Sequence, residues 1–437
     1  MSFPLFLIYL VMSFIRPDAF APGLAAYRPM AILMALALPA AVFAQLRKPK
    51  RRVRPAAFTV LVLLVASIAA SQIANHWLGG AAQAVSTFLP SAAIALLAML
   101  NLTDERRLRI VVGWIELCIV GLTAMCIYSY YTGYQVNTFV MAEFGSSHLG
   151  ASALQGPFIP AHAHTPGVLF RIRSVGFLQD PNDFAQMIVV TLLLLFGERA
   201  PGRLIHNTWR VYIPSLILLF GLYLTHSRGA LVGLGLVLAS TLPRRIGMLR
   251  AAILFSLFAV AAELTNFTGG RAISDQDASA ANRIDFWNLG IHLLAKNPVF
   301  GVGFSNFSLY SSITAHNSFV LCFAELGLVG FFWWMAFIIL AYQSTGTAIL
   351  ASKAGSQQQR FATALRGALI GFLGCAWFLS RTYEPGLYIV CGLCLAASGC
   401  LTGEIDRKRW GGVTIITMLV VLIAVYGFVV LQRVLGR

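Results

Sequence analysis

Charged side chains are scarce in this sequence: Asp, Glu, Lys and Arg make up 11% of its 437 residues, against about 25% in an average soluble protein. No P-loop, internal repeat or low-complexity tail is found. All seven cysteines lie inside apolar runs, which excludes a disulfide framework, and Cys391 and Cys394 are interpreted as small helix residues rather than a redox pair. These absences argue against a soluble enzyme and against a disulfide-stabilised domain.

Groups of metal ligands are equally scarce. Asp275 and Asp277 form a lone acidic pair, and His162 and His164 form a lone histidine pair. Neither pair makes a convincing ligand set for zinc or calcium. We therefore predict that the protein has no metal and no cofactor.

Long apolar runs dominate the chain instead, since 58% of its residues are hydrophobic. The first run has no basic residue before it and no small-residue cleavage site, so we expect a retained helix rather than a signal peptide. The pattern predicts an all-α polytopic integral membrane protein with about 12–13 transmembrane helices, folded as a single transmembrane domain over residues 1–437. The expected spans are 2–15, 29–46, 56–76, 81–101, 109–130, 184–197, 211–226, 229–243, 251–264, 318–342, 367–380, 386–403 and 412–432.

The basic residues predict the orientation of these spans. A formal net charge of +16 would suggest nucleic acid as a partner of a soluble chain. Here the basic residues cluster in short connections, as the positive-inside rule predicts, and we expect no nucleic acid. With the N-terminus in the cytoplasm, 21 Lys and Arg residues lie inside and 11 outside. Two long loops, 131–182 and 265–317, then face outward, and long loops in compact proteins are usually functional.

The second loop contains a predicted amphipathic helix over residues 282–296, which Asn297 and Pro298 end. Its polar face holds Asp285, Asn288, His292 and Lys296. Arg283 falls on the opposite, apolar side, near the helix start. A guanidinium there can pair with a carboxylate, extend to the membrane surface or bind an anion, and the sequence leaves these alternatives open.

Other outward arginines precede apolar runs. Arg228 lies in the turn "THSRGALVG" between two spans, where the alternative to a functional role is an interfacial anchor. Arg173 lies in "RIRSVGFLQDPNDFAQ", which enters the next span. Asp180 and Asn182 in that segment are possible supporting residues, although a turn followed by a helix cap, with Asp183 as the favoured cap, explains them equally well.

His316 lies just before the run that begins at residue 318. A histidine, with an ordinary pKa of about 6.5, suits proton abstraction near neutral pH, although an interfacial histidine is the simpler explanation. Glu325 lies inside the span, and an intramembrane carboxylate indicates either a functional role or helix packing.

Several arginines beside a histidine on one side of a membrane suit an anionic headgroup whose lipid tail stays in the bilayer. Guanidinium groups match phosphate geometry, so two or three of them can hold a diphosphate and stabilise it as a leaving group. The histidine would then deprotonate a hydroxyl that attacks the carbon bearing the diphosphate.

The segments "SRGALVG", "NRIDFWNLGIHLLAKNPVFGVGFSNF", "AHNSFVLCFAELGLVG" and "GFLQDPNDFA" together resemble the O-antigen ligase family, over residues 171–335. The resemblance implies a glycosyltransferase of lipopolysaccharide biosynthesis, in the bacterial inner membrane with its active site facing the periplasm. It would transfer a glycan from undecaprenyl diphosphate to a hydroxyl of lipid A–core without a metal. Arg228 and Arg283 would bind the diphosphate, with Arg173 as a third cation, and His316 would be the general base. Thirteen apolar runs depart from the family's usual twelve.

Two alternatives stay open. An O-antigen polymerase or a protein O-oligosaccharyltransferase of the same superfamily would use similar chemistry on a different acceptor. A lipid-linked glycan flippase or transporter is also basic and polytopic, but it should place charges along a path at the membrane midplane. Nearly all the arginines here are expected at the membrane surfaces.

Overall fold

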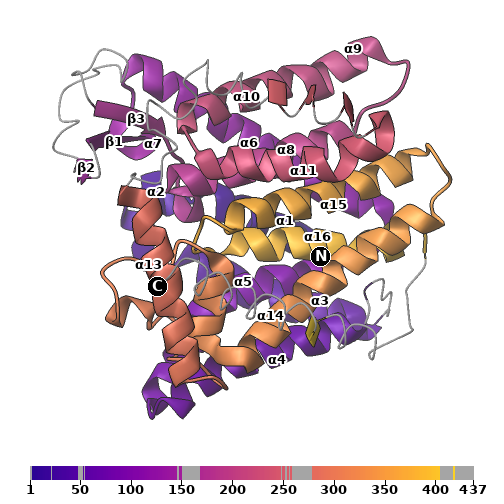
Figure 1. Cartoon of the computed structure of the whole chain (residues 1–437). Helices are drawn as coiled ribbons and strands as arrows, with labels where there is room; N and C mark the ends of the chain where they lie inside the picture. Colours follow the sequence, from indigo (N-terminus) through magenta and orange to yellow (C-terminus); the bar gives the residue numbers. More distant parts are fainter. Residues whose placement is uncertain are drawn as a thin grey trace. The chain divides into compact units, whose positions relative to one another are not determined.

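The computed structural model describes residues 2–20, 22–47, 53, 55–144, 147–149, 168–247, 249–250, 253–254, 256–257, 278–403 and 417–418. Within these residues, seven helices are long and apolar enough to cross a membrane, and three shorter apolar helices accompany them (Figure 1). The predicted all-α polytopic membrane fold is confirmed. The spans expected at 251–264 and 412–432 fall almost wholly outside the described residues.

The chain forms two compact units, which are described separately. Unit 1 comprises Met1–Ala37, Arg109–Ile273 and Thr363–Cys375. Its whole helices are α1 (Ser2–Ile15), α2 (Pro17–Phe20), η1 (Pro22–Tyr27), α7 (Val136–Phe139), η4 (Gly176–Leu178), α8 (Pro181–Gly197), α9 (Leu204–Asn207), α10 (Ile213–Thr225) and α11 (Arg228–Ile246). It also holds the first part of α3 (Pro29–Arg47), most of α6 (Glu105–Thr132) and the larger part of α15 (Gln357–Ala376). A π-helical turn, η5 (Thr208–Tyr212), joins α9 to α10.

Unit 2 comprises Leu38–Leu108, Ser274–Ala362 and Ala376–Arg437. It holds the second part of α3 (Pro29–Arg47), α4 (Pro55–Ala74), α5 (Leu78–Asn101), α13 (Ala278–Lys296), η6 (Phe307–Leu309), α14 (Ser318–Ala351), the first part of α15 (Gln357–Ala376) and α16 (Pro385–Leu401). Helix α14 packs against α4, α13 and α16, and α5 packs against α4 and α16 (Figure 1).

A small antiparallel sheet in unit 1 was not predicted from the sequence. It has the strand order β2–β1–β3, with β1 (Val140–Phe144) between β2 (Ser147–Leu149) and β3 (Val168–Ile172). The strands lie in the first long loop, next to α7 in the chain (Figure 1). Val140, Ala142 and Phe170 are buried and form the apolar core of this sheet with Val136.

Helix α15 also differs from its predicted span of 367–380. It begins ten residues earlier, at Gln357, with the polar sequence QQQR, and it ends at Ala376. The predicted span began where the continuous apolar run begins. Hydropathy alone therefore located the apolar half of this helix and missed its polar first turns.

Helix α14 is broken inside its apolar run at Gly327, where the backbone has φ 64° and ψ −166°. Four backbone hydrogen bonds of 2.9–3.2 Å join residues 298–303 to residues 324–329 across the break. The break leaves the carbonyl groups of Ala324 and Glu325 without their helical partners. In two of these bonds they accept the N–H groups of Val302 and Gly303 instead. A polar backbone group inside a membrane protein must find a protein partner, and this loop supplies it.

Helix α4 binds the other side of the same loop. Gln72 donates from Nε2 to the carbonyl of Phe304 at 2.7 Å, and Asn75 donates from Nδ2 to that of Gly301 at 3.0 Å. The Phe304 N–H donates to the Ser71 hydroxyl at 3.1 Å. The loop between α13 and α14 is thus fixed by helices on both sides.

We predict that Gly327→Ala destabilises the folded protein by about 3 kcal/mol or more. A Cβ at position 327 would meet the backbone carbonyl of Val299, and the backbone angles there suit only glycine. Gly355→Ala is the matched control, because Gly355 has φ +72° but open space around it. Gly355→Ala should lower the free energy of unfolding by about 1 kcal/mol. Thermal unfolding of the detergent-purified variants measures both, and equal losses would contradict the packing argument.

Candidate active site

The loop that enters α8 is organised in unit 1 by Arg171, whose side chain is 3% exposed. Its guanidinium donates to the Glu143 carboxylate at 2.7 Å, to Oδ1 of Asn182 at 2.8 Å and to the carbonyl of Thr225 at 2.7 Å. These partners belong to β1, α8 and the last turn of α10. A buried guanidinium needs such pairing to offset its desolvation. Arg171 therefore fixes the position of three elements, one of which ends just before Arg228.

Asp180 and Asn182 have structural contacts in this arrangement. Asp180 is the N-cap of α8, and its carboxylate accepts the N–H of Asn182 at 2.7 Å. The cap favoured from the sequence, Asp183, was wrong by three residues: α8 begins at Pro181, and Asp183 lies buried in its first turn. Proline at the first helical position after an Asp cap is the signal that could have located the true start.

Arg173 is half-buried beside the sheet. Its side chain donates to the carbonyl of Asn137 at 2.7 Å, while its Nε is buried without a hydrogen-bond partner among the described residues. Burial lowers the pKa of the Arg173 guanidinium, and the Asp180 carboxylate opposes that shift. A cation with an unsatisfied N–H can still accept an anionic ligand.

Arg228 is the first residue of α11 and is half-buried. Before it, His226 ends α10 in the left-handed conformation with φ 48°, and the buried Ser227 hydroxyl has no hydrogen-bond partner among the described residues. The N-terminus of a helix carries partial positive charge and unpaired N–H groups. The turn therefore places a guanidinium where the backbone also favours an anion.

Arg283 and His316 both lie in unit 2 and are brought into one region by α13 and the start of α14. Arg283 and Phe286 are one turn apart on α13, and the Phe286 ring lies 6.2 Å from the His316 ring between centroids. The guanidinium of Arg283 lies 5.8 Å from the Phe378 ring centroid. Arg283 thus lies beside one aromatic ring, and its neighbour on the next turn of α13 contacts the histidine.

The backbone of His316 is held in an unusual conformation. It has φ 48°, which few residues other than glycine and asparagine adopt. The next residue, Asn317, is the N-cap of α14 and accepts the N–H groups of Phe319 and Val320 at 2.9 and 3.2 Å. The helix cap therefore fixes the histidine immediately before it.

Arg381 is a further cation in this region that the sequence did not single out. The backbone N–H of Arg381 donates to the Ser318 hydroxyl at 2.9 Å, and the Thr382 hydroxyl donates to the Ser318 carbonyl at 2.7 Å. Its guanidinium lies 3.8 Å from Glu384, a carboxylate whose pKa burial raises and Arg381 lowers. The segment after α15 is thereby tied to the first residue of α14, two positions after His316.

Glu325 lies away from these groups, fully inside α14 and 2% exposed. Its carboxylate accepts the N–H of Phe307 at 3.1 Å from the loop that packs on the break. The buried Tyr383 hydroxyl has its pKa raised well above its ordinary value by burial and further by the Glu325 carboxylate. Among the described residues these contacts are structural.

The predicted amphipathic helix is present as α13, and it begins earlier than expected, at Ala278. Asp285, His292 and Lys296 are exposed on its polar side. Gly290 is buried and faces Val320 of α14, so a glycine allows close packing of the two helices. The helix therefore rests on α14 and presents its polar side away from it.

Two features of the site had weak signals in the sequence. The glycines of "GVG" and of "ELG" mark the loop and the break of α14, but their pairing depends on contacts between distant segments. Arg171 was indistinguishable from its neighbour Arg173 without knowledge of the sheet.

Among the described residues, no group of three or more acidic, histidine or cysteine side chains is placed to hold a metal. The Asp275 and Asp277 pair and the His162 and His164 pair fall outside the described residues.

No curated protein matches the chain. A family model described as O-antigen ligase matches residues 213–335, which is less than half of the chain. The matched segment runs from the start of α10 to the second half of α14 and contains Arg228, Arg283 and His316. The central part of this multi-pass membrane protein, residues 213–335, is thus similar to the O-antigen ligase family.

Proposed function

We propose that the protein transfers a glycan from undecaprenyl diphosphate to a hydroxyl of lipid A–core. The reaction takes place at the periplasmic face of the bacterial inner membrane, in a single transmembrane domain over residues 1–437. The observation that carries the proposal is the O-antigen ligase domain at 213–335, which contains both predicted donor arginines and the predicted base. The outward loops 131–182 and 265–317 form the active side.

In this scheme Arg228 and Arg283 bind the donor diphosphate, and Arg173 adds a third cation. The position of Arg228 at the first residue of α11 supports its role, because the helix N-terminus and the guanidinium attract the same anion. The unsatisfied Nε of Arg173 supports the third contact. Guanidinium groups suit this task better than ammonium groups, since two parallel N–H bonds fit phosphate oxygens.

His316 acts as the general base. It takes the proton of the acceptor hydroxyl as the oxygen attacks the anomeric carbon of the glycan. The bond between that carbon and the diphosphate oxygen breaks, and undecaprenyl diphosphate leaves with its charge balanced by the arginines. The scheme assigns no role to a metal or a cofactor.

Asp180, Asn182 and Glu325 support the site without touching substrate. Asp180 caps α8, and Asn182 accepts a bond from Arg171. Glu325 holds the loop that leads to His316. Arg171 belongs to the same class as a positioning residue, because it holds the end of α10 that precedes Arg228.

Reconstituted transfer tests the function. Purified protein in liposomes, supplied with undecaprenyl-diphosphate glycan and lipid A–core, should form glycosylated lipid A–core in the presence of EDTA. Parallel reactions with a second donor molecule or a peptide as acceptor distinguish the polymerase and protein-transferase alternatives. Product that forms only with those acceptors, or translocated donor without any product, would contradict the ligase assignment.

The roles of Arg228 and Arg171 are separable by a double-mutant cycle. Arg228→Lys keeps the charge but loses the planar fork, so donor affinity should fall about 30-fold, on the order of 2 kcal/mol. Arg171→Lys should also weaken donor binding, since lysine cannot reach three partners at fixed angles. If Arg171 acts by placing Arg228, the double variant should be little worse than Arg228→Lys alone.

Donor affinity and thermal stability are measured for each variant of this cycle. Glu143→Gln is the matched control for Arg171, because it keeps the hydrogen-bonding shape at 143 and removes only its charge. Additive losses of donor affinity in the double variant would reduce Arg171 to a purely structural residue.

A further inference from the structure

A pocket of about 430 Å³ lies in unit 2 between α3, α4 and α5. Its walls include Val42 and Leu46 of α3, Pro55 and Phe58 of α4, and Met99 of α5. The volume falls within the range of small-molecule sites. Val42 is 44% exposed and Leu46 77% exposed, and both belong to α3, which is apolar enough to span a membrane. The pocket is therefore open toward the surface that membrane lipid covers.

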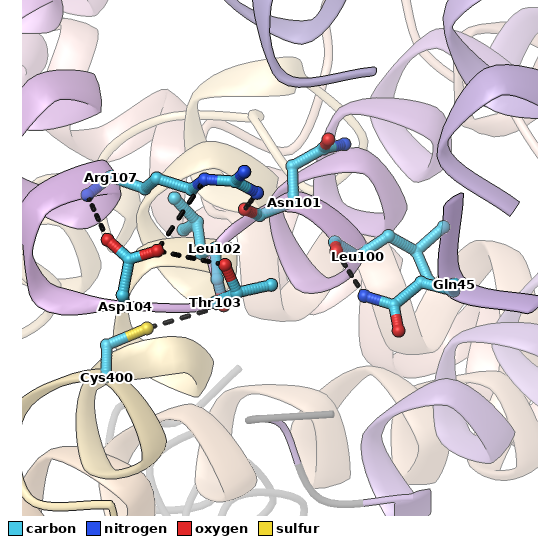
Figure 2. A network of polar contacts seen from close by, with 8 residues as sticks. All are labelled: Gln45, Leu100, Asn101, Leu102, Thr103, Asp104, Arg107 and Cys400. Atoms are coloured by element: carbon cyan, nitrogen blue, oxygen red, sulfur yellow. Dashed lines mark hydrogen bonds and ion pairs between the residues drawn. The ribbon is translucent and has the colours of Figure 1, made fainter. Parts of the chain in front are cut away.

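Two polar side chains, Gln45 and Thr59, line this otherwise apolar pocket, and the Thr59 hydroxyl donates to the carbonyl of Pro55 at 3.5 Å. Gln45 donates from Nε2 to the carbonyl of Leu100 at 2.6 Å, while its Oε1 is buried and has no hydrogen-bond partner among the described residues (Figure 2). A buried acceptor left without a donor costs free energy. Because the unsatisfied atom is an acceptor oxygen, a ligand that satisfies it must be a hydrogen-bond donor.

Positive charge flanks the pocket on two sides. Arg47 ends α3, two residues after Gln45, and its guanidinium lies 4.4 Å from the Phe43 ring centroid. Arg107 donates to the carbonyl of Asn101, the residue after the Leu100 that binds Gln45, and it also pairs with Asp104 at 3.6 Å, which offsets part of its charge (Figure 2). In the sequence five more basic residues follow Arg47 before Pro55, and they fall outside the described residues. Such clusters next to a membrane helix attract anionic lipids.

We propose that this pocket binds one anionic phospholipid whose headgroup carries a hydroxyl, as in phosphatidylglycerol. An acyl chain lies between Leu46, Phe58 and Met99, and the headgroup hydroxyl donates to Gln45 Oε1. The phosphodiester stays near the guanidinium groups. A zwitterionic lipid has a donor in its ammonium group but lacks the net negative charge that the basic flank favours.

Native mass spectrometry of the full-length, delipidated protein tests the proposal with three lipids of equal chain length. Phosphatidylglycerol should bind at least about fivefold more tightly than phosphatidylethanolamine, which has no net charge. It should also bind about fivefold more tightly than phosphatidylmethanol, which has the same charge and no headgroup hydroxyl. The second comparison isolates the bond to Gln45.

Two variants of α3 then remove different features of the pocket. Gln45→Leu should abolish the preference over phosphatidylmethanol, and Val42→Trp should reduce binding of every lipid by filling the pocket. Ile32→Trp is the control, because Ile32 is 52% exposed on the same helix and does not line the pocket. If Gln45→Leu fails to fold, the proposal is still tested by Val42→Trp and by the comparison of phosphatidylglycerol with phosphatidylmethanol on the wild-type protein.

Equal binding of phosphatidylglycerol and phosphatidylmethanol by the wild-type protein would overturn the proposal. So would unchanged binding in Val42→Trp. Displacement of phosphatidylglycerol by undecaprenyl phosphate at similar concentration would reassign the pocket to a polyprenyl lipid. None of these outcomes bears on glycan transfer, which is assayed separately.

Discussion

Backbone hydrogen bonding in an apolar environment is the constraint on which the structure around His316 depends. The break at Gly327 removes helical partners from the carbonyls of Ala324 and Glu325, and the loop at 298–303 replaces them. A membrane interior offers no water to replace these partners. Separating the loop from α14 would therefore cost a large amount of free energy. The same loop joins α13 to the cap of α14. The broken helix thereby fixes the chain on both sides of the candidate base.

The arginines divide into two classes by their surroundings. Arg171 is buried and spends its donors on Glu143, Asn182 and the end of α10. Arg228 and Arg283 are half-buried, one at a helix start and the other beside an aromatic ring. The buried Arg171 holds three partners, whereas the half-buried Arg228 and Arg283 remain partly accessible to solvent. Burial therefore separates Arg171 from the two arginines proposed to bind the donor better than sequence position does.

Much of the fold was predictable because hydropathy and helical periodicity are local. The apolar runs located the described spans, and the pattern from Asn282 to Lys296 predicted α13. The N-cap of α8 was misplaced because Asp180 and Asp183 are chemically equal and only the proline between them decides. The sheet, the Arg171 contacts and the α14 break join segments far apart in sequence. No local pattern encodes them.

The candidate site was predictable only in part for the same reason. His316 and Arg283 were selected by their chemistry, and the structure adds that Phe286 and the α14 cap bring them into one region. Arg381 was passed over because nothing in its sequence neighbourhood marks it. Arg381 lies beside the start of α14 because the Thr382 hydroxyl bonds to the Ser318 carbonyl. That contact depends on tertiary packing.

The most direct test of the central claim is single-turnover glycan transfer by His316→Asn, with donor binding measured in parallel. Asparagine tolerates the left-handed backbone that residue 316 adopts, so the variant removes the base with little strain. The account predicts donor affinity close to wild type and transfer slower by about 10²- to 10⁴-fold, the usual contribution of a general base. Near-normal transfer would contradict the account, and lost donor binding would make His316 a diphosphate ligand instead.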